Sequence, residues 1–340
     1  MKITVLLGGV SSERDVSLAS GVRIAQALRS RGHQVTAVDT ARGVLDEAGE
    51  RALLVGDTMK TRPPSLDQLE ALSRTALSPA LGTLPAIRQA DVIFLALHGG
   101  QGEDGTIQAL LDLVGVTYTG SGHLGSALAM DKDLAKHLFR ASGVGTADWL
   151  MAPVTVDQVE RTLGLPVVVK PSKQGSTVGL TLVKERAQIA AAIAEARKYD
   201  DEVMIERFVP GRELTVPVIG GRAFPVGEIF PKHEIYDYEC KYTKGMAVEE
   251  FPAKLTPEQT AEVQRQALAA FAALKLRGYA RIDFRLAPDG RFYCLEANTL
   301  PGMTELSLVP QSAAAAGVSF PELCERIALL ARDGDAAGRD

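Results

Sequence analysis

Charged and amide side chains concentrate in two short segments near the carboxyl end of the chain. Residues 281–284 read Arg-Ile-Asp-Phe and residues 293–298 read Tyr-Cys-Leu-Glu-Ala-Asn, with Ala-Pro-Asp-Gly at 287–290 between them. Aromatic and β-branched residues favour strands, and a Pro-Asp-Gly sequence favours a tight turn. These residues therefore predict a β-hairpin that carries polar side chains.

The alternation of side chains along a strand decides which of these groups meet. Arg281 and Asp283 share one face of the first strand. Cys294, Glu296 and Asn298 share one face of the second. A four-residue turn pairs Asp283 opposite Cys294, next to Glu296, and gathers two carboxylates, an amide and a guanidinium. Such an oxygen-rich cluster suits Mg²⁺ better than zinc. A polar sheet face with a structural ion pair is the alternative that these residues leave open.

Length and composition limit the classes of protein that remain. The chain has 340 residues, of which 46% are hydrophobic, and a net charge of -5. This length allows about two or three domains with their own cores, and the mild acidity does not favour nucleic-acid binding. The cysteines at 240, 294 and 324 show no CxxC spacing, which argues against a zinc site or a disulfide framework. No apolar run approaches the ~20 residues of a membrane span. We therefore expect a cytoplasmic protein without membrane contact.

Strands and helices alternate upstream of the hairpin and must position it. A strand at residues 2–7, a glycine turn at 8–9, a helix at 17–31 and a strand at 34–38 form a β-α-β start, which predicts a parallel sheet. Residues 40–85 match no motif beyond one short strand and are interpreted as an irregular insertion. Further strands are expected at 52–55, 91–97, 116–119, 166–170, 180–183, 203–206, 213–218 and 223–229, and further helices at 106–114, 132–142, 156–163, 187–198, 257–274 and 320–331.

These elements group into an α/β fold of several domains. We expect an N-terminal α/β domain with a parallel sheet at residues 1–121 and a central subdomain with a glycine-rich loop at 122–212. A C-terminal subdomain that carries the hairpin follows at 213–331. The last residues, 332–340, are expected to be a frayed tail.

Two glycine patterns match G-x-G-x-x-G, at residues 100–105 and 120–125, and each follows a strand and precedes a helix. The first carries Glu103 and Asp104 where a pyrophosphate would have to bind, and carboxylates repel that ligand. The second lies late in the chain, after several strands. A Rossmann dehydrogenase therefore stays only as a remote alternative. The two carboxylates have a structural explanation, because they can satisfy donors at a helix N-terminus.

The loop at residues 170–179, Lys-Pro-Ser-Lys-Gln-Gly-Ser-Thr-Val-Gly, has a different character. It is not a Walker A sequence, because no Lys-Ser/Thr pair follows its glycines. It offers backbone donors, hydroxyls and lysines between two strands, which is typical of loops that cover nucleotide phosphates. Taken alone, an ordinary polar hairpin explains it as well.

Nine motifs in order resemble the D-alanine–D-alanine ligases of the ATP-grasp fold. They lie at residues 8–17, 98–105, 118–122, 130–132, 170–176, 206–213, 236–242, 278–283 and 295–303. The match runs from about residue 3 to residue 330, and nine ordered motifs are far more specific than any single one. The resemblance implies an ATP-grasp fold with an N-terminal parallel-sheet α/β domain.

The resemblance also implies a reaction, the ATP-dependent joining of two D-alanine molecules to D-alanyl-D-alanine for bacterial peptidoglycan. A D-alanine carboxylate attacks the γ-phosphate to give an acyl phosphate. The amine of a second D-alanine then attacks the acyl carbon and expels phosphate, while ADP is the other product. The protein must neutralise phosphate charge, stabilise an oxyanion and exclude water.

The family pattern assigns the nucleotide and metal contacts. Asp283, Glu296 and Asn298 would hold two Mg²⁺ ions, with Mn²⁺ as a possible substitute. Lys132 and Lys170 would contact the α- and β-phosphates as point charges, and a solvated helix start is the alternative for Lys132. The carboxylate at 206 would hold the adenine amine and that at 213 the ribose hydroxyls, unless either is a surface charge. The full ATP-binding set is Lys132, Lys170, Ser176, Glu206, Arg207, Val209, Glu213, Lys241 and Asn298.

The resemblance assigns the catalytic and substrate contacts as well. Arg281 and the Gly302 N–H would stabilise the phosphoryl group and the tetrahedral oxyanion. Glu13 would bind the ammonium of the first D-alanine, with a helix-capping carboxylate as the alternative. The catalytic set is Glu13, Ser176, Tyr242, Arg281, Gly302 and Ser307, and the substrate-binding set is Glu13, His98, Lys241, Arg281, Gly302, Ser307 and Leu308.

Individual roles within these sets follow the same pattern. Ser176 and Tyr242 would bond with Glu13 and lock a closed loop, and Lys241 would reach the transferred phosphate. Ser307 with the Leu308 backbone would receive the second carboxylate. His98 would lie near the first substrate, although a satisfied structural histidine is a serious alternative.

Other readings remain open from the sequence. Tyr242 favours the dipeptide, because related ester-forming ligases that use D-lactate commonly have a histidine in this loop. A ligase for another carboxylate and amine, a dehydrogenase and a non-catalytic α/β binding protein are the further alternatives. The expected partners are D-alanine and ATP, and the family implies a homodimer.

Overall fold

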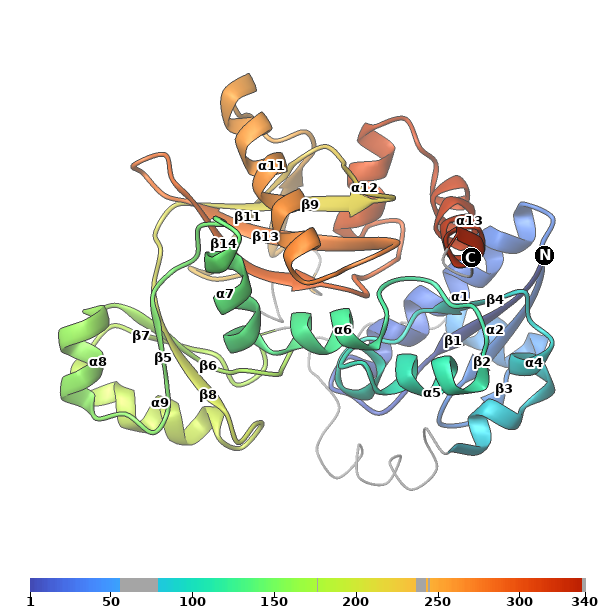
Figure 1. Cartoon of the computed structure of the whole chain (residues 1–340), viewed down its shortest axis with the longest axis horizontal. Helices are drawn as coiled ribbons and strands as arrows, with labels where there is room; N and C mark the ends of the chain where they lie inside the picture. The colour runs from blue at the N-terminus through green and yellow to red at the C-terminus, as the bar shows by residue number, and fades with distance from the viewer. Residues whose placement is uncertain (56–78, 176, 237–242, 244, 338–340) are drawn as a thin grey trace.

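The computed structural model describes residues 1–55, 79–175, 177–236, 243 and 245–337. Its strands form three sheets that follow one another along the chain, at residues 2–95, 149–207 and 212–298. Figure 1 shows the C-terminal sheet above and between the N-terminal sheet and the central sheet.

The N-terminal sheet has the strand order β3-β2-β1-β4 within the described residues. β1 (Lys2–Leu7) pairs in parallel with β2 (Gln34–Asp39) and β4 (Val92–Leu95), whereas β3 (Gly43–Val44) pairs antiparallel with β2. β1 and β4 are almost wholly buried, as expected for strands of a parallel sheet that is covered on both faces. α1 (Arg14–Ser30) packs on β1 and β2. The predicted parallel sheet is confirmed, with an added antiparallel edge.

The last helix returns to this N-terminal sheet. α13 (Phe320–Ala337) packs against α1 and β4, and both chain ends lie on the same side of the molecule in Figure 1. Leu323 and Ile327 share one hydrophobic core with Val5 and Phe94. The end of the chain thereby ties the C-terminal part to the N-terminal part.

The other two sheets are antiparallel. The central sheet has the order β5-β8-β6-β7, and the C-terminal sheet has the order β12-β11-β9-β13-β14 with β10 beside β9. Their strands are β5 (Trp149–Met151), β6 (Val167–Pro171), β7 (Thr181–Val183), β8 (Val203–Arg207), β9 (Arg212–Ile219), β10 (Arg222–Ala223), β11 (Gly227–Pro231), β12 (Ala247–Glu250), β13 (Tyr279–Leu286) and β14 (Phe292–Asn298).

Three of the described α-helices begin at a side-chain cap. α7 (Lys132–Ala141) starts where the Asp131 side chain accepts a hydrogen bond from the Leu134 N–H at 3.0 Å. α8 (Val156–Leu163) and α11 (Pro257–Ala273) each start with a Thr–Gln capping box. The remaining helices are α2 (Glu47–Val55), α4 (Pro85–Arg88), α5 (Thr106–Val114), α6 (His123–Met130), α9 (Ile189–Ala196) and α12 (Leu308–Ala315), with short 3₁₀ turns at Pro79–Thr83, Gly100–Gly102 and Arg186–Gln188.

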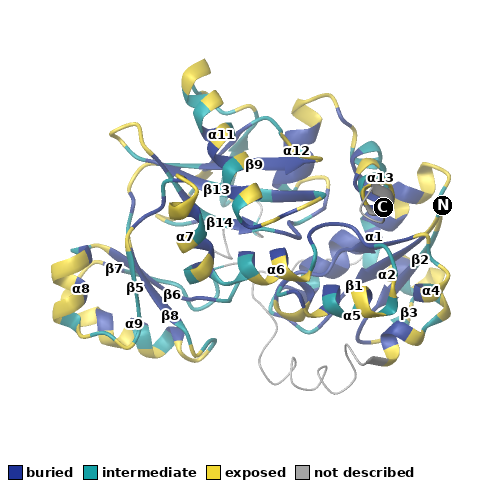
Figure 2. Cartoon of the chain, in the orientation of Figure 1, coloured by how far each residue is buried: buried dark blue, intermediate teal, exposed yellow. Residues whose placement is uncertain are grey.

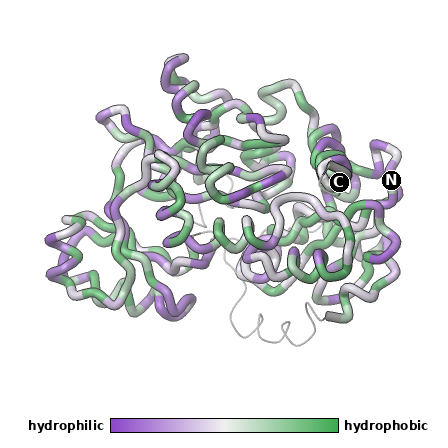
Figure 3. The backbone as a smooth tube through the Cα atoms, in the orientation of Figure 1, coloured by the Kyte–Doolittle hydropathy of each residue, from purple (hydrophilic) through white to green (hydrophobic). Residues whose placement is uncertain are grey.

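Burial follows the three sheets. Figure 2 shows buried residues along the strands and exposed residues on outward helices such as α8, and Figure 3 shows hydrophobic stretches along the same strands. No helix in the described part of the chain combines the length and the hydrophobicity that a membrane span needs.

Several predicted elements differ from the structure. The strand predicted at 52–55 is the end of helix α2, because its apolar residues pack as a helical face beside α1. The strand predicted at 116–119 is only an isolated bridge between Tyr118 and Ile93. α13 continues to Ala337, through most of the predicted tail. β5, β12, α6 and α12 have no counterpart among the predicted elements.

Both glycine patterns serve packing. Gly105 has φ +96°, and a Cβ there would lie 2.5 Å from the His123 carbonyl oxygen. Gly120 has φ +85°, and a Cβ at Gly278 would lie 3.2 Å from its Cα. The glycines therefore allow backbone segments to approach closely, and a side chain at either position would be strained.

Candidate active site

A bulge in the β13–β14 hairpin decides which side chains face the site. Asp283 lies opposite Glu296. The next residue, Phe284, pairs with Cys294, so Leu295 is an extra residue in the second strand. The predicted pairing of Asp283 with Cys294, on the face of Glu296, is therefore wrong. The bulge turns Cys294 into the hydrophobic core, where it is fully buried.

Four polar groups nevertheless meet on one face of the hairpin. The Arg281 Nη2 atom lies 2.8 Å from Asp283 Oδ2, and its Nε lies 2.9 Å from Oδ1. The Asn298 amide donates to Asp283 Oδ2 at 3.0 Å and faces Glu296 Oε1 at 3.4 Å. Thr215 on the neighbouring strand β9 donates to Asp283 Oδ1 at 2.7 Å. The predicted cluster is thus present, with a hydroxyl that the sequence did not indicate.

The electrostatics of this cluster fix the charge of its guanidinium. Burial lowers the pKa of Arg281, but the charge and hydrogen bonds of Asp283 outweigh it and hold the pKa above its usual range. Among the described residues, no group of three or more His, Cys, Asp or Glu side chains is placed to hold a metal. The candidate ligands are therefore two carboxylates, Asp283 and Glu296, and the Asn298 amide oxygen.

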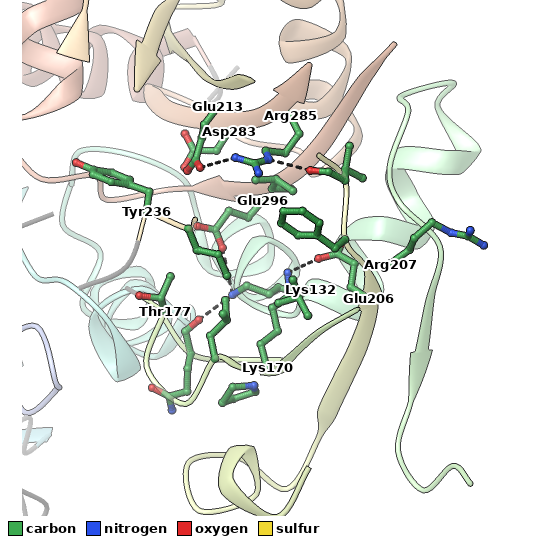
Figure 4. Close-up of a pocket in the computed structure, with 18 of the residues that line it drawn as sticks. Lys132, Lys170, Thr177, Glu206, Arg207, Glu213, Tyr236, Asp283, Arg285 and Glu296 are labelled. Carbon is green, nitrogen blue, oxygen red and sulfur yellow. Dashed lines mark hydrogen bonds and ion pairs between the residues drawn. The ribbon is translucent and has the colours of Figure 1, made fainter. Parts of the chain in front are cut away.

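A pocket between the central and C-terminal sheets has the two carboxylates of this cluster on one wall (Figure 4). Asp283 and Glu296 line one side, and Lys132 and Lys170 line the other. The Lys132 ammonium donates to the Gln174 carbonyl at 2.8 Å and lies 3.3 Å from Glu296. Both lysines predicted to contact phosphate therefore face the same space.

A buried ionic triad lies behind the lysine wall. Glu206 accepts from Lys170 at 2.6 Å through one oxygen and from Lys136 through the other. The Lys136 ammonium also donates to Thr146 Oγ1 at 2.5 Å, and its side chain has no exposed area. Burial raises the pKa of Glu206, but the two ammonium groups overcome it and lower the pKa to about 2. Lys136 is absent from the predicted set, although it lies one helical turn after Lys132 on the same face.

The same pocket contains further predicted nucleotide contacts. Val209 and Glu213 line it together with Arg285, which donates to the Val209 carbonyl at 3.1 Å and to Glu213 at 3.0 Å. Arg207 also lines the pocket, but its guanidinium points away (Figure 4) and donates to the Thr162 carbonyl. The Arg207 side chain is therefore a poor candidate for a nucleotide contact.

A second pocket adjoins the first at the hairpin and is lined by Glu13, His98, Arg281, Gly302 and Ser307. Glu13 lies at the N-terminus of α1 and is buried. Ser307 lies at the N-terminus of α12, where free backbone N–H groups favour an anion. The pocket thus offers an anionic group at one helix start and an anion-binding position at another.

The glycine-rich loop reaches this second pocket. A Cβ added at Gly175 would lie 2.5 Å from Glu13 Oε2, so the loop touches the start of α1. The predicted partners Ser176, Lys241 and Tyr242 lie outside the described residues.

His98 is enclosed by the protein. Its Nδ1 lies 2.6 Å from the Leu300 carbonyl oxygen, and its Nε2 lies 3.1 Å from Ser20 Oγ. Both ring nitrogens therefore have protein partners, which favours the structural alternative over direct substrate binding. Ser20 is also absent from the predicted set, although it follows Glu13 by two helical turns.

Glu103 and Asp104 have separate roles. Asp104 accepts from the Thr106 N–H at 2.9 Å and satisfies a donor at the start of α5, as predicted. Glu103 instead accepts from the N–H groups of Gly99 at 2.8 Å and Leu300 at 3.1 Å. Glu103 therefore does not satisfy the donors of α5, but its carboxylate fixes the preceding turn and the backbone at Leu300.

Comparison with known protein families gives two matches that together cover most of the chain. Residues 2–121 match the family model described as D-ala D-ala ligase N-terminus, and residues 137–329 match that described as D-ala D-ala ligase C-terminus. A protein of Pelobacter propionicus named D-alanine–D-alanine ligase is 43% identical over 333 residues, covering 97% of this chain and 96% of its own. A protein of the same name from Anaeromyxobacter sp. is 41% identical over 330 residues, covering 96% and 95%.

Solved structures give the same result. The D-alanine–D-alanine ligase of Coxiella burnetii superposes with a TM-score of 0.82 at 28% identity, covering 99% of this chain and 95% of its own. The Bacillus anthracis enzyme, in a structure described as complexed with ATP, gives 0.74 at 29% identity, covering 100% and 99%.

Replacing Lys136 by Met tests the buried triad. The substitution leaves the buried Glu206 carboxylate with one ammonium partner, and breaking a buried pair costs about 3–5 kcal/mol. Urea unfolding should show that the free energy of unfolding decreases by this amount. Lys254→Met, which removes an exposed partner of Glu250, should change the free energy of unfolding by less than about 1 kcal/mol. Equal effects of the two substitutions would show that the triad is not energetically special.

Glu103 should leave a signature in the pH dependence of stability. Burial raises its pKa from 4.5 to about 8, and the charge of Glu13 adds to this. The folded state then holds a proton that the unfolded state releases, so this contribution is complete below pH 4.5 and is lost as the pH rises through 8. The free energy of unfolding, measured with urea from pH 5 to 9, should therefore fall more steeply for wild type than for Glu103→Gln. Parallel curves would contradict this assignment.

Proposed function

This chain belongs to the D-alanine–D-alanine ligase family, and we propose from this premise how its residues join two D-alanine molecules at the expense of ATP. The family membership and the match to solved ligases identify the ATP-grasp fold that the sequence motifs implied. This family membership excludes the dehydrogenase alternative. The two glycine patterns that suggested it serve packing instead.

The single observation that carries the proposal is the meeting of two pockets at one hairpin. β13 and β14 present Asp283 and Glu296 to the pocket lined by lysines, and they present Arg281 and Asn298 to the pocket that contains Glu13. A phosphoryl donor bound in the first pocket therefore faces an acceptor bound in the second. The transfer requires such an alignment, because most of the catalysis of phosphoryl transfer comes from positioning and charge stabilisation.

The first pocket supplies what a nucleotide needs. Lys132 and Lys170 reach the polyphosphate as point charges, and each already rests on a carboxylate that holds it in place. Glu206 stays ionised because of its two lysines, so it accepts a hydrogen bond from the adenine amine and repels a carbonyl at that position. Glu213, held by Arg285, lines the same pocket and would accept hydrogen bonds from the ribose hydroxyls.

The hairpin also fits a hard divalent cation. Asp283, Glu296 and Asn298 would hold it, because together they offer carboxylate and amide oxygens on one surface. The Asn298 amide now directs its NH₂ group at both carboxylates, so ligation requires that it turn its oxygen toward the same point. When bound, Mg²⁺, or Mn²⁺ in its place, neutralises charge on the β- and γ-phosphates. The family pattern supports two ions.

The second pocket binds and activates the amino acids. Glu13 accepts the ammonium of the first D-alanine, whose carboxylate oxygen attacks the γ-phosphorus as ADP leaves. Arg281 and the Gly302 N–H stabilise charge on the transferred group and later on the tetrahedral oxyanion. A nearly fixed positive charge on Arg281 suits this task.

The second D-alanine completes the reaction. Ser307 and the Leu308 N–H, at the start of α12, receive its carboxylate. Its amine attacks the acyl carbon, the C–N bond forms, the amine loses a proton, and the C–O bond to phosphate breaks. The product is D-alanyl-D-alanine, a precursor for peptidoglycan.

Finer features belong to the same proposal. Ser176 and Tyr242 lock the glycine-rich loop on Glu13, and the position of Gly175 beside that carboxylate supports this role. Lys241 contacts the transferred phosphate, and Tyr242 favours an amine over a hydroxy acid as second substrate. Family membership supports a cytoplasmic homodimer with the three-part division at residues 121 and 212.

Phosphate release from ATP that depends on added D-alanine tests the activity. Wild type should release phosphate only when D-alanine is present. Arg281→Ala should lower kcat by about 10²–10³ or more, because it removes the main oxyanion donor. Arg291→Ala changes an exposed arginine of the same hairpin that pairs with Asp289, and should stay within about twofold of wild type. Wild-type rates in Arg281→Ala would remove Arg281 from the catalytic set.

Glu296→Gln tests the metal ligands. Loss of one carboxylate should weaken Mn²⁺ binding to the ADP complex by at least about tenfold, as seen in electron paramagnetic resonance titrations. The Mg²⁺ concentration for half-maximal activity should rise in parallel. Glu234→Gln, which alters an exposed partner of Lys184, is the matched control. Unchanged Mn²⁺ affinity in Glu296→Gln would exclude Glu296 as a ligand.

A further inference from the structure

The segment at residues 300–303, which carries Gly302, is held by side chains from the opposite end of the chain. The Leu300 N–H donates to Glu103 at 3.1 Å, and the Leu300 carbonyl accepts from His98 Nδ1 at 2.6 Å. The Met303 N–H donates to Ser20 Oγ at 3.2 Å. Gly302 therefore lies between two backbone anchor points, one on each side.

The directions of these hydrogen bonds form one consistent set. A carbonyl only accepts, so His98 Nδ1 carries the hydrogen that the Leu300 carbonyl receives. In the neutral ring Nε2 is then an acceptor, and the Ser20 hydroxyl donates to it. The Ser20 oxygen is left to accept the Met303 N–H. Burial lowers the pKa of His98, which agrees with a neutral ring.

The anchoring groups are shielded from water. Ser20 is fully buried, and His98, Leu300 and Met303 are each no more than 4% exposed. Water cannot replace a lost partner there, so each bond restrains the segment more than a surface bond would.

We infer that Ser20 is a positioning residue that acts through Met303 and His98 to aim the Gly302 N–H at the developing oxyanion. This inference rests on the proposed role of Gly302. Oxyanion donors act only when they are fixed where charge develops, and a displacement of about 1 Å can cost about 100-fold in rate.

Helix α1 thereby sets the spacing between two parts of the site. Glu13, at its N-terminus, faces the ammonium of the first substrate, and Ser20 follows seven residues later. Seven residues of helix span about 10 Å. Helix α1 therefore positions both Glu13, which binds the first substrate, and the segment that carries Gly302.

Ser20→Ala tests the inference, with Ser17→Ala as the matched control. Ser17 lies on the same helix and is also fully buried, and its hydroxyl donates to the Ala96 carbonyl at 2.6 Å and accepts from the Gly8 N–H at 2.8 Å. Each substitution removes one buried hydroxyl group that makes two hydrogen bonds, so the two substitutions should destabilise the fold comparably. Only Ser20→Ala releases the segment that carries Gly302.

The expected result separates positioning from stability. Per folded enzyme, Ser20→Ala should lower kcat by about tenfold or more while KM for ATP stays unchanged. Ser17→Ala should keep kcat within about twofold at a similar cost in unfolding free energy. Ser20→Cys, which keeps a weak donor and acceptor, should give an intermediate kcat.

Two outcomes would overturn the inference. Unchanged kcat in Ser20→Ala would show that the segment needs no such anchor, and equal loss of kcat in Ser17→Ala and Ser20→Ala would reduce Ser20 to a structural role. Wild type that releases no phosphate in response to D-alanine would instead overturn the proposed function.

Discussion

Buried charge that must be compensated is the constraint on which this site depends. Lys132 forms an ion pair with Glu296, Lys170 with Glu206, and Arg281 with Asp283. An ion left without a partner away from water costs several kcal/mol, so these pairs hold each cation in place before any substrate arrives. In the proposed reaction, phosphates and carboxylates of the substrates bind to charges that are already fixed, which is the preorganisation that phosphoryl transfer requires.

No single part of the chain contains the whole site. The proposed metal ligands and Arg281 lie on the C-terminal hairpin, and the lysines proposed to contact phosphate lie around the central sheet. Glu13 and Ser20 belong to the N-terminal helix α1 and its cap. α13 ties the parts together by packing on α1 and β4. Catalysis therefore depends on the relative placement of the three sheets as much as on any individual residue.

The sequence predicted the polar cluster of the hairpin from strand alternation alone, and the motif order predicted the fold. The bulge at Leu295 could not be predicted, because its effect depends on packing of Cys294 into the core. Lys136 and Ser20 were missed for a related reason, since a buried lysine or serine looks like any helix residue until its tertiary partners are known. Helical spacing from Lys132 and Glu13 was the available signal, but spacing alone does not say which face is buried.

The most direct test follows the carboxylate oxygens of D-alanine, because the proposed reaction passes through an acyl phosphate. If D-alanine labelled with ¹⁸O in its carboxylate attacks the γ-phosphorus of ATP, the oxygen that forms the acyl phosphate leaves with phosphate in the second step. Mass spectrometry should therefore find one labelled oxygen transferred to each phosphate released, while ADP stays unlabelled. Unlabelled phosphate, or label in AMP, would contradict the acyl-phosphate account of this site.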